Sequence, residues 1–323
     1  MYVLGVDTGG TKSRCIVVDE SNTLLGMGEA GPGNYRVAGP DGARENVETA
    51  IRDALADAGV DTAAHLVGGF GMGTLDTEED RAIIEGFLDE IAFVDERYVT
   101  NDVVAAYYAV TAGGPGLVVI AGTGAMGFGR NEAGERARSS GWGWLFGDEG
   151  GGYDAARRGL QAASKAHDGR GQQTKLVEAA CEHFDLDSFE DVFNGVYDEI
   201  DHAKDIASFA KPVAETALEG DDVAIELVEE SAAELASAAE AVIEKLDLAP
   251  APTVACLGSY GRSEAVSPRF ESNVRERYPE AEFADPVDNP AVGSIAFVAE
   301  ERGEEITVSD LHELDAAISE AKK

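Results

Sequence analysis

The stretch that decides the fold is Asp7-Thr8-Gly9-Gly10-Thr11-Lys12. Apolar residues precede it at positions 2–6 and follow it at 15–18, a pattern that predicts a strand, a tight turn and a second strand. Glycines let the backbone approach a ligand, and successive N–H groups with hydroxyls can cradle phosphate. An aspartate at the end of the first strand can hold Mg²⁺ through water. A glycine hairpin turn without a ligand fits the same residues.

A second stretch with the same arrangement lies about a domain length further along the chain. The apolar run 116–121 ends in Gly122-Thr123-Gly124-Ala125, and another strand-like segment follows. Each of the two turns could grip one side of a polyphosphate. Two matching turns are hard to explain as accidental hairpins, so together they predict a nucleotide site.

The periodicity of apolar residues predicts an α/β fold of two mixed domains that face each other across a cleft. Each half of the chain starts with three short strands and continues with alternating helices and strands, and the second half also contains a long helical insertion. The expected parts are a first domain over 1–112, a second over 113–304 with its insertion at about 149–248, and a last helix, 305–323, that packs back on the first domain.

The charge of the chain is extreme, with 62 acidic against 25 basic residues and a net charge of −37. Because the apolar content of 44% is ordinary, the acidity is not a sign of disorder. Acid-rich proteins with a normal core are typical of the high-salt cytoplasm of halophiles, where screening removes the repulsion. Such a charge argues against a nucleic-acid partner. No apolar run approaches a membrane span, so we expect a cytoplasmic protein with no membrane partner.

Four motifs follow one another along the chain: Gly5-Val6-Asp7-Thr8-Gly9-Gly10-Thr11-Lys12, Thr100-Asn101-Asp102, Ala121-Gly122-Thr123-Gly124, and Gly141-Trp142-Gly143-Trp144-Leu145-Phe146-Gly147-Asp148-Glu149-Gly150. Taken in this order, they resemble the N-acetylglucosamine kinase and BadF/BadG/BcrA/BcrD ATPase family, within the sugar kinase/Hsp70/actin superfamily. The resemblance runs from residue 1 to about 300 and implies two actin-like, ribonuclease H-like domains.

The resemblance implies that the chain binds MgATP. Asp7 would support Mg²⁺ through water, Thr8 to Thr11 would contact the β and γ phosphates, and Lys12 could stabilise the transferring phosphoryl group. The second turn would hold phosphate as well, and small residues further along would let the purine lie against the backbone. The implied nucleotide-binding residues are Asp7, Thr8, Gly9, Gly10, Thr11, Lys12, Gly122, Thr123, Gly124, Gly258 and Ser259.

Asp102 is the candidate general base, since phosphoryl transfer needs a carboxylate that orients the acceptor hydroxyl and takes its proton. Capping of the helix that follows is the alternative role of Asn101 or Asp102. The implied sugar-binding residues are Asn34, Asp102, Trp142, Gly147 and Asp148. Asp148 could instead cap a helix, and Asn34 could be an ordinary turn residue.

The function implied is transfer of the γ-phosphoryl group of MgATP to a hydroxyl of an amino sugar, N-acetylglucosamine or glucosamine, or of a related hexose. Ala125 and Met126 depart from the family pattern and weaken the case for N-acetylglucosamine itself. Related proteins are often dimers, so we expect a homodimer. The alternatives are an ATPase that activates a CoA-ester reductase or dehydratase through a cysteine-bound iron–sulfur cluster, and a non-catalytic sugar or nucleotide sensor.

Overall fold

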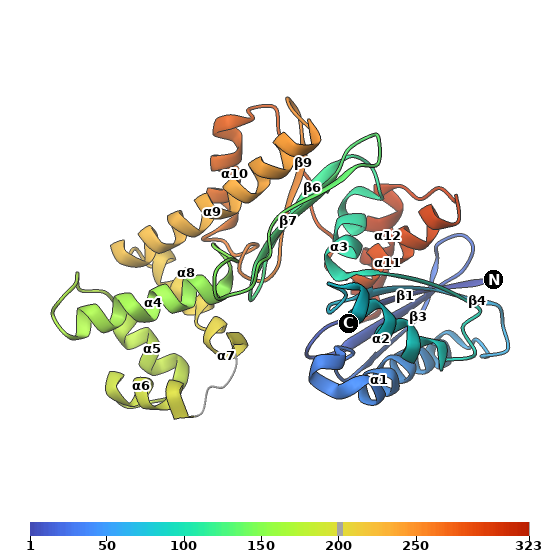
Figure 1. Cartoon of the computed structure of the whole chain (residues 1–323), viewed down its shortest axis with the longest axis horizontal. Helices are drawn as coiled ribbons and strands as arrows, with labels where there is room; N and C mark the ends of the chain where they lie inside the picture. Colours follow the sequence, from blue (N-terminus) through green and yellow to red (C-terminus); the bar gives the residue numbers. More distant parts are fainter. Residues whose placement is uncertain (199–202, 323) are drawn as a thin grey trace. The chain divides into compact units, whose positions relative to one another are not determined.

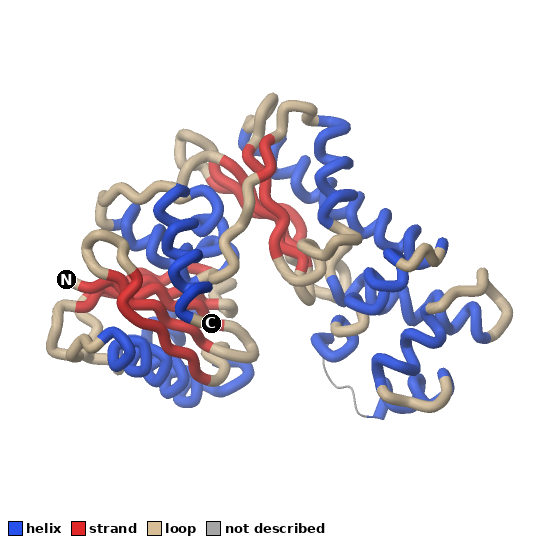
Figure 2. Tube along the Cα trace, turned by 180° about the vertical axis from the view of Figure 1, so that it is seen from behind, coloured by secondary structure: helices blue, strands red, loops and turns tan. Residues whose placement is uncertain are grey.

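A computed structural model describes residues 1–198 and 203–322. The chain forms two compact units, Met1–Gly114 with Asp285–Lys323 as unit 1 and Pro115–Ala284 as unit 2. Each unit is built on one five-stranded mixed sheet with helices packed on it (Figures 1 and 2). In the described part of the chain, no helix is both long enough and apolar enough to cross a bilayer.

Unit 1 contains sheet A, with the strand order β3-β2-β1-β4-β5. The first three strands form an antiparallel meander, and β4 and β5 are added in parallel on the other side of β1. The elements are β1 (Tyr2–Thr8), β2 (Ser13–Val18), β3 (Leu24–Ala30), α1 (Tyr35–Ala58), β4 (Leu66–Met72), α2 (Glu78–Asp89), β5 (Glu96–Asn101), α3 (Asp102–Thr111), α11 (Ala291–Glu301) and α12 (Val308–Ala321).

Alternation along the strands of sheet A produces two different faces. Leu4 and Val6 on one face pack with α1 and α2 in a core that contains Ile51 and Phe87. On the other face, a Cβ atom at Gly5 would lie 2.3 Å from the carbonyl oxygen of Ala291. Glycine at this position therefore lets α11 lie directly on the strands.

Unit 2 contains sheet B, with the strand order β10-β9-β6-β7-β8. Helix α9 covers β6, β7 and β8, and α4 to α8 pack beyond it. Its elements are β6 (Gly116–Ala121), β7 (Ala125–Arg130), β8 (Arg136–Ser140), α4 (Gly152–His167), α5 (Leu176–Phe184), α6 (Phe189–Asp198), α7 (Ala203–Ala207), α8 (Ala210–Leu218), α9 (Asp222–Leu246), β9 (Thr253–Leu257), α10 (Ser267–Arg277) and β10 (Glu282–Phe283).

The two units differ from the expected domains at one boundary. The predicted second domain ran to residue 304, whereas the segment from Asp285 onward belongs to unit 1, because α11 packs against β1, β4 and α3. Helix α12, as expected, contacts elements of unit 1, namely α3, α11 and β3. Helix α9 lies inside the predicted insertion, yet it covers sheet B and is part of the basic unit.

Candidate functional site

In unit 1, the turn between β1 and β2 is closed by a hydrogen bond of 2.9 Å from the Gly9 N–H to the Lys12 carbonyl. Asp7 stands at the penultimate position of β1. Burial raises the pKa of its carboxyl to about 6, and the negative charge of Asp102 adds to the rise against the opposing Arg14 and Lys12. Asp102 therefore lies close enough at this edge of sheet A for its charge to disfavour ionisation of Asp7.

Asp102 is the first residue of α3, and Asn101 is the N-cap. The side-chain oxygens of both residues accept the Val103 N–H, each at 2.8 Å. Desolvation raises the pKa of the Asp102 carboxyl, with a further rise from the charge of Asp76. Asn101 thus caps the helix, which is the alternative that the sequence left open, and the Asp102 carboxyl accepts a bond at the same helix start.

Gly73 lies between Asp102, the candidate base, and the turn between β1 and β2, which is the first of the two predicted phosphate turns. A Cβ atom at this position would lie 2.9 Å from the Thr8 carbonyl oxygen and 3.2 Å from Asp102 Oδ2. The Gly73 N–H also donates to the Thr8 carbonyl at 3.2 Å. A side chain here would push the turn and the carboxylate apart, so glycine allows them to meet.

The loop before α1 lies against the same turn, because a Cβ atom at Gly33 would be 2.5 Å from Ser13 Oγ and 2.8 Å from Thr8 Cβ. Asn34 is the N-cap of α1, and its side-chain oxygen accepts the Arg36 N–H at 2.9 Å. The predicted sugar contact therefore depends on its amide nitrogen.

Asp80 holds the first turn of α1 against α2. Its Oδ1 accepts bonds from the Tyr35 hydroxyl and from Arg36 Nη2, the latter at 2.7 Å. Thr77 donates to the other oxygen, Oδ2, at 2.7 Å. The pKa of this buried carboxyl is lowered, first by the Tyr35 and Thr77 hydrogen bonds. The loop that leads into α1, residues 31–34, is therefore held against the β1–β2 turn at Gly33 and against α2 through Tyr35 and Arg36.

Two of the predicted phosphate ligands have other partners in the structure. The Lys12 ammonium forms an ion pair with Glu29 at 2.9 Å, and Arg14 joins the same carboxylate at 3.3 Å. The Thr8 hydroxyl is buried and donates to the Gly71 carbonyl at 3.3 Å. A phosphate contact by Thr8 would therefore come from its backbone.

In unit 2, the loop Gly122-Thr123-Gly124 is fastened to the start of α4. The N–H groups of Gly152 and Tyr153 donate to the carbonyls of Gly122 and Thr123, each at 2.8 Å. The N-cap, Gly151, has no side chain that could satisfy the helix start. The loop carbonyls take that role, so the loop and the helix form one rigid corner.

Asp148 lies over this corner in the left-handed region, with φ of 59°. A Cβ atom at Gly124 would lie 2.2 Å from Asp148 Oδ2, and the Gly143 N–H donates to Oδ1 at 3.1 Å. Because α4 starts later, at Gly152, the side chain of Asp148 does not cap it. Desolvation raises the pKa of this carboxyl. Asp148 thus connects the second phosphate loop with the tryptophan loop.

The tryptophan loop, residues 142–147, has an unusually exposed set of apolar side chains: Trp142, Trp144, Leu145 and Phe146, with exposed fractions of 64%, 54%, 73% and 74%. Glycine at position 147 allows the loop to turn back, since a Cβ atom there would lie 2.7 Å from Trp142 Cβ. This exposure excludes a core-packing role for the Trp142 indole.

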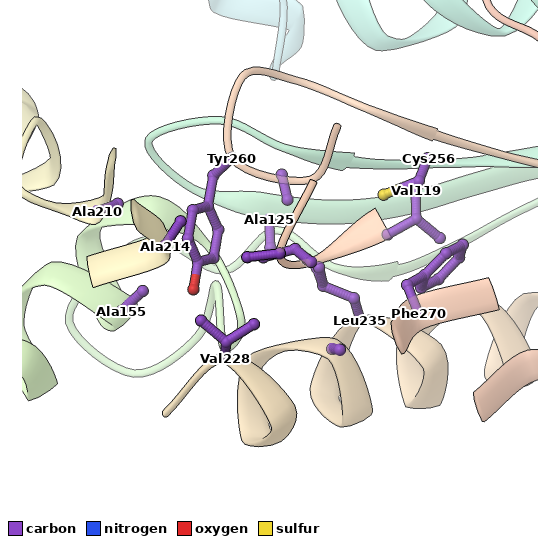
Figure 3. Close-up of a cluster of buried hydrophobic side chains, with 14 of the residues drawn as sticks. Val119, Ala125, Ala155, Ala210, Ala214, Val228, Leu235, Cys256, Tyr260 and Phe270 are labelled. Atoms are coloured by element: carbon purple, nitrogen blue, oxygen red, sulfur yellow. The ribbon is translucent and has the colours of Figure 1, made fainter. Parts of the chain in front are cut away.

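A pocket of about 670 Å³ opens beside the second phosphate loop. Gly258, with φ of 86°, turns the chain after β9 so that the N–H groups of Tyr260 and Gly261 reach the Ala121 carbonyl at 3.1 and 2.9 Å. The Tyr260 ring extends toward α9, and its hydroxyl donates to Ser231 Oγ at 3.2 Å (Figure 3). The lining residues include Gly122, Thr123, Ser259, Tyr260, Ala214 and Glu264.

The sequence did not reveal that α8 forms one wall of this pocket, through Lys211, Ala214, Glu215 and Leu218. No local signal marks these residues, because their pattern is that of an ordinary amphipathic helix. The structure brings the predicted residues together as two sets. Unit 1 carries Asp7 to Lys12, Asn34 and Asp102, and unit 2 carries Gly122 to Gly124, Trp142, Gly147, Asp148, Gly258 and Ser259.

Within residues 1–198 and 203–322, no group of three or more His, Cys, Asp or Glu side chains is arranged to hold a metal ion. The carboxyl oxygens of Asp7 are hard donors of the kind that Mg²⁺ takes, and phosphate oxygens and water would have to supply the rest of its shell. Burial raises the pKa of the Cys15 thiol and that of Cys256, the latter to about 12, which disfavours the thiolate form that ligates iron.

Comparisons with known proteins show what the whole chain is similar to. A sequence model of the BadF/BadG/BcrA/BcrD ATPase family matches residues 4–298. The N-acetylmuramic acid/N-acetylglucosamine kinase of Clostridium acetobutylicum is 28% identical over 302 residues, which cover 93% of this chain and 99% of that protein. The N-acetyl-D-glucosamine kinase of Dictyostelium discoideum is 29% identical, with 90% and 95% covered.

Among solved structures, a Chromobacterium violaceum protein described provisionally as an N-acetylglucosamine kinase superimposes with a TM-score of 0.75. It is 24% identical, and the match covers 91% of this chain and 97% of that one. This likeness supports the fold, two mixed α/β sheets of the actin-like type.

Proposed function

The chain belongs to the BadF/BadG/BcrA/BcrD ATPase family, and we propose that it is a sugar kinase that transfers the γ-phosphoryl group of MgATP to a hydroxyl of an amino sugar or related hexose. Its full-length similarity to enzymes named as kinases of N-acetylated amino sugars supports this activity. The single observation that carries the proposal is the junction at Gly73, where the phosphate turn and Asp102 approach each other.

Asp102 acts as the general base. Burial raises the pKa of its carboxyl, which favours acceptance of the proton from the acceptor hydroxyl as the oxygen attacks. The new bond joins that oxygen to the γ-phosphorus, and the bond between the γ-phosphorus and the β–γ bridging oxygen breaks as ADP leaves. The anchored Asn101 cap fixes the position of Asp102 at the start of α3.

Asp7 supports Mg²⁺ through water, and the metal neutralises charge on the nucleotide phosphates when it is bound. Asp102 lies close enough for its charge to raise the pKa of Asp7, and two such carboxylates offer the oxygen ligands that Mg²⁺ prefers. In unit 2, the Gly122–Gly124 loop contacts phosphate, and the pocket beside Ser259 and Tyr260 receives the nucleoside. An apolar pocket of this size is suited to a purine.

Asn34 and Asp148 bind hydroxyls of the sugar, and Trp142 packs on the apolar side of the sugar ring. The indole is available for this, because almost two thirds of its surface is exposed. A homodimer in the cytoplasm is the setting we propose, since related proteins are often dimers and the nucleotide substrate is cytoplasmic.

The test is ADP release in concentrated KCl against N-acetylglucosamine, N-acetylmuramic acid, glucosamine, glucose and ketodeoxy sugars. We expect turnover to depend on at least one amino sugar and to stop with EDTA, then to return on addition of Mg²⁺. ADP release that no sugar stimulates would contradict kinase activity and leave ATPase function. The activator alternative predicts brown protein that contains iron, which the same preparation would reveal.

A further inference from the structure

Two arginines of the edge strand β8, Arg136 and Arg138, have no acidic partner among the described residues within ion-pair distance. In a chain with 62 acidic residues this is unusual. Both are exposed and lie two residues apart, so they extend from the same face of the strand. The opposite face packs toward α9, since a Cβ atom at Gly129 would lie 2.8 Å from Val242 Cγ1.

The two arginines differ in what lies next to them. The Arg138 guanidinium carbon lies 4.8 Å from the centre of the Trp142 ring. The carbonyl of Arg138 accepts a bond of 2.9 Å from Lys245 Nζ, which holds the backbone of β8 at this residue. Stacking on an indole fixes the plane of a guanidinium while its N–H groups stay available to an anion.

Trp142 is directly connected to the proposed sugar residue Asp148. The carboxyl of Asp148 accepts the Gly143 N–H at 3.1 Å, and Gly147 packs on the Trp142 Cβ. Asp148, Trp142 and Arg138 therefore follow one another along the surface of unit 2. A sugar that is bound to Asp148 and packed on Trp142 would direct one substituent toward the guanidinium.

We propose that Arg138, stacked on Trp142, is an anion subsite of the acceptor site and selects amino sugars that carry a carboxylate. This inference rests on the proposed sugar kinase activity. A guanidinium can bind both oxygens of a carboxylate through parallel N–H bonds. Because Arg138 is exposed, the gain is expected to be about tenfold in specificity, at the lower end for charge-assisted hydrogen bonds.

The experiment uses a pair of substrates that differ by one group, N-acetylmuramic acid and N-acetylglucosamine, of which only the first carries a lactyl carboxylate. The wild-type ratio of kcat/KM for the acidic over the neutral sugar is expected to be well above one. In Arg138→Gln this ratio falls about tenfold, and in Arg138→Lys it falls by less. Arg136→Gln is the matched control, because it removes the same charge from the same strand face without contact to Trp142.

Added KCl provides a second readout, since screening raises the KM of the acidic sugar more than that of the neutral sugar. Equal ratios in the wild type and Arg138→Gln, or an equal fall in Arg136→Gln, would overturn the subsite while leaving the kinase intact. If neither of these two sugars is phosphorylated, the result contradicts the proposed kinase activity on them, and the anion subsite is then tested by binding. Quenching of Trp142 fluorescence in a Trp144→Phe background then still measures whether the acidic sugar binds better and whether Arg138 is responsible.

Discussion

Sheet A of unit 1 and sheet B of unit 2 share one topology with different residues at the strand ends. Each consists of an antiparallel meander followed by two strands added in parallel beside the first. In both, glycines let a long helix approach: a Cβ atom at Gly28 would lie 2.2 Å from the Ala50 carbonyl, and one at Gly127 would lie 3.1 Å from that of Ala238.

The difference lies in the charges. Asp7 occupies the penultimate position of β1, whereas Ile120 occupies the same position of β6. Unit 1 has acidic groups with raised pKa values at its strand ends, and unit 2 has a pocket and an inserted set of helices. In the proposed function, metal and proton chemistry therefore belong to unit 1 and nucleoside binding to unit 2.

The largest effect is expected from removing a carboxylate from each unit. Asp102→Asn should lower kcat by about 10²–10⁴-fold, because the amide cannot accept the proton, while the KM for ATP stays within a few fold. Asp148→Asn should act mainly on the KM of the sugar, because only hydroxyl binding is altered. Steady-state kinetics in which the concentrations of ATP and sugar are both varied would measure kcat and the two KM values. If the two variants changed kcat and KM in the same way, the proposed separation of roles between unit 1 and unit 2 would be wrong.

A smaller effect is expected from the glycine that follows the fourth strand of each sheet. Gly73→Ala should lower kcat by roughly 10-fold, since its Cβ would push against Thr8 and Asp102. Gly258→Ala should instead raise the KM for ATP and cost about 1–3 kcal/mol of stability, because its φ is 86° and its Cβ would lie 2.4 Å from the Ala121 carbonyl.

Gly86→Ala is the control for these two variants, because nothing lies within 4 Å of a Cβ atom there. This residue lies within α2, so alanine should stabilise the protein by about 0.5–1 kcal/mol and leave the kinetics unchanged. Urea unfolding and initial rates would measure the three variants together. A Gly73→Ala enzyme with normal kcat would remove the main support for the junction at that residue.

The pH dependence of stability should differ between the wild type and Asp7→Asn. The folded pKa of about 6 lies above the ordinary 3.8, so the protonated carboxyl contributes stability that is complete below pH 3.8 and is lost as the pH rises through 6. Relative to Asp7→Asn, the wild type should lose at most about 3 kcal/mol between pH 4 and 7. Urea unfolding without Mg²⁺ checks this, and a constant difference between the two proteins would contradict it.

The smallest difference between the units is expected from salt. Acidic residues are spread along both units, so KCl from dilute to molar concentration should raise the melting temperature of the whole chain by screening their repulsion. Calorimetry at increasing KCl concentration would measure this, and we expect the melting temperatures of the two units to rise together. Equal melting temperatures in dilute and concentrated KCl would contradict the salt requirement.

Periodicity in the sequence was enough to predict the meander and most helices, because these depend on neighbouring residues. The apolar period predicts a helix over about 41–58, and the structure adds a first turn from Tyr35, which Asn34 caps, ahead of the non-helical residue Gly39. The assignment of α11 to unit 1 was missed, since it depends on glycines in distant strands. Likewise, the Glu29 partner of Lys12 comes from another strand.

The sequence by itself determined the two glycine turns, the order of the strands along the chain and the residue types on which the proposed phosphoryl transfer depends. These follow from local backbone preference and side-chain chemistry, which act within a few residues. Only the tertiary structure decided the raised pKa of Asp7, the meeting of Thr8 and Asp102 at Gly73, and the pocket beside Tyr260. Each of these depends on desolvation or close packing between segments far apart in the chain, and no local pattern records such contacts.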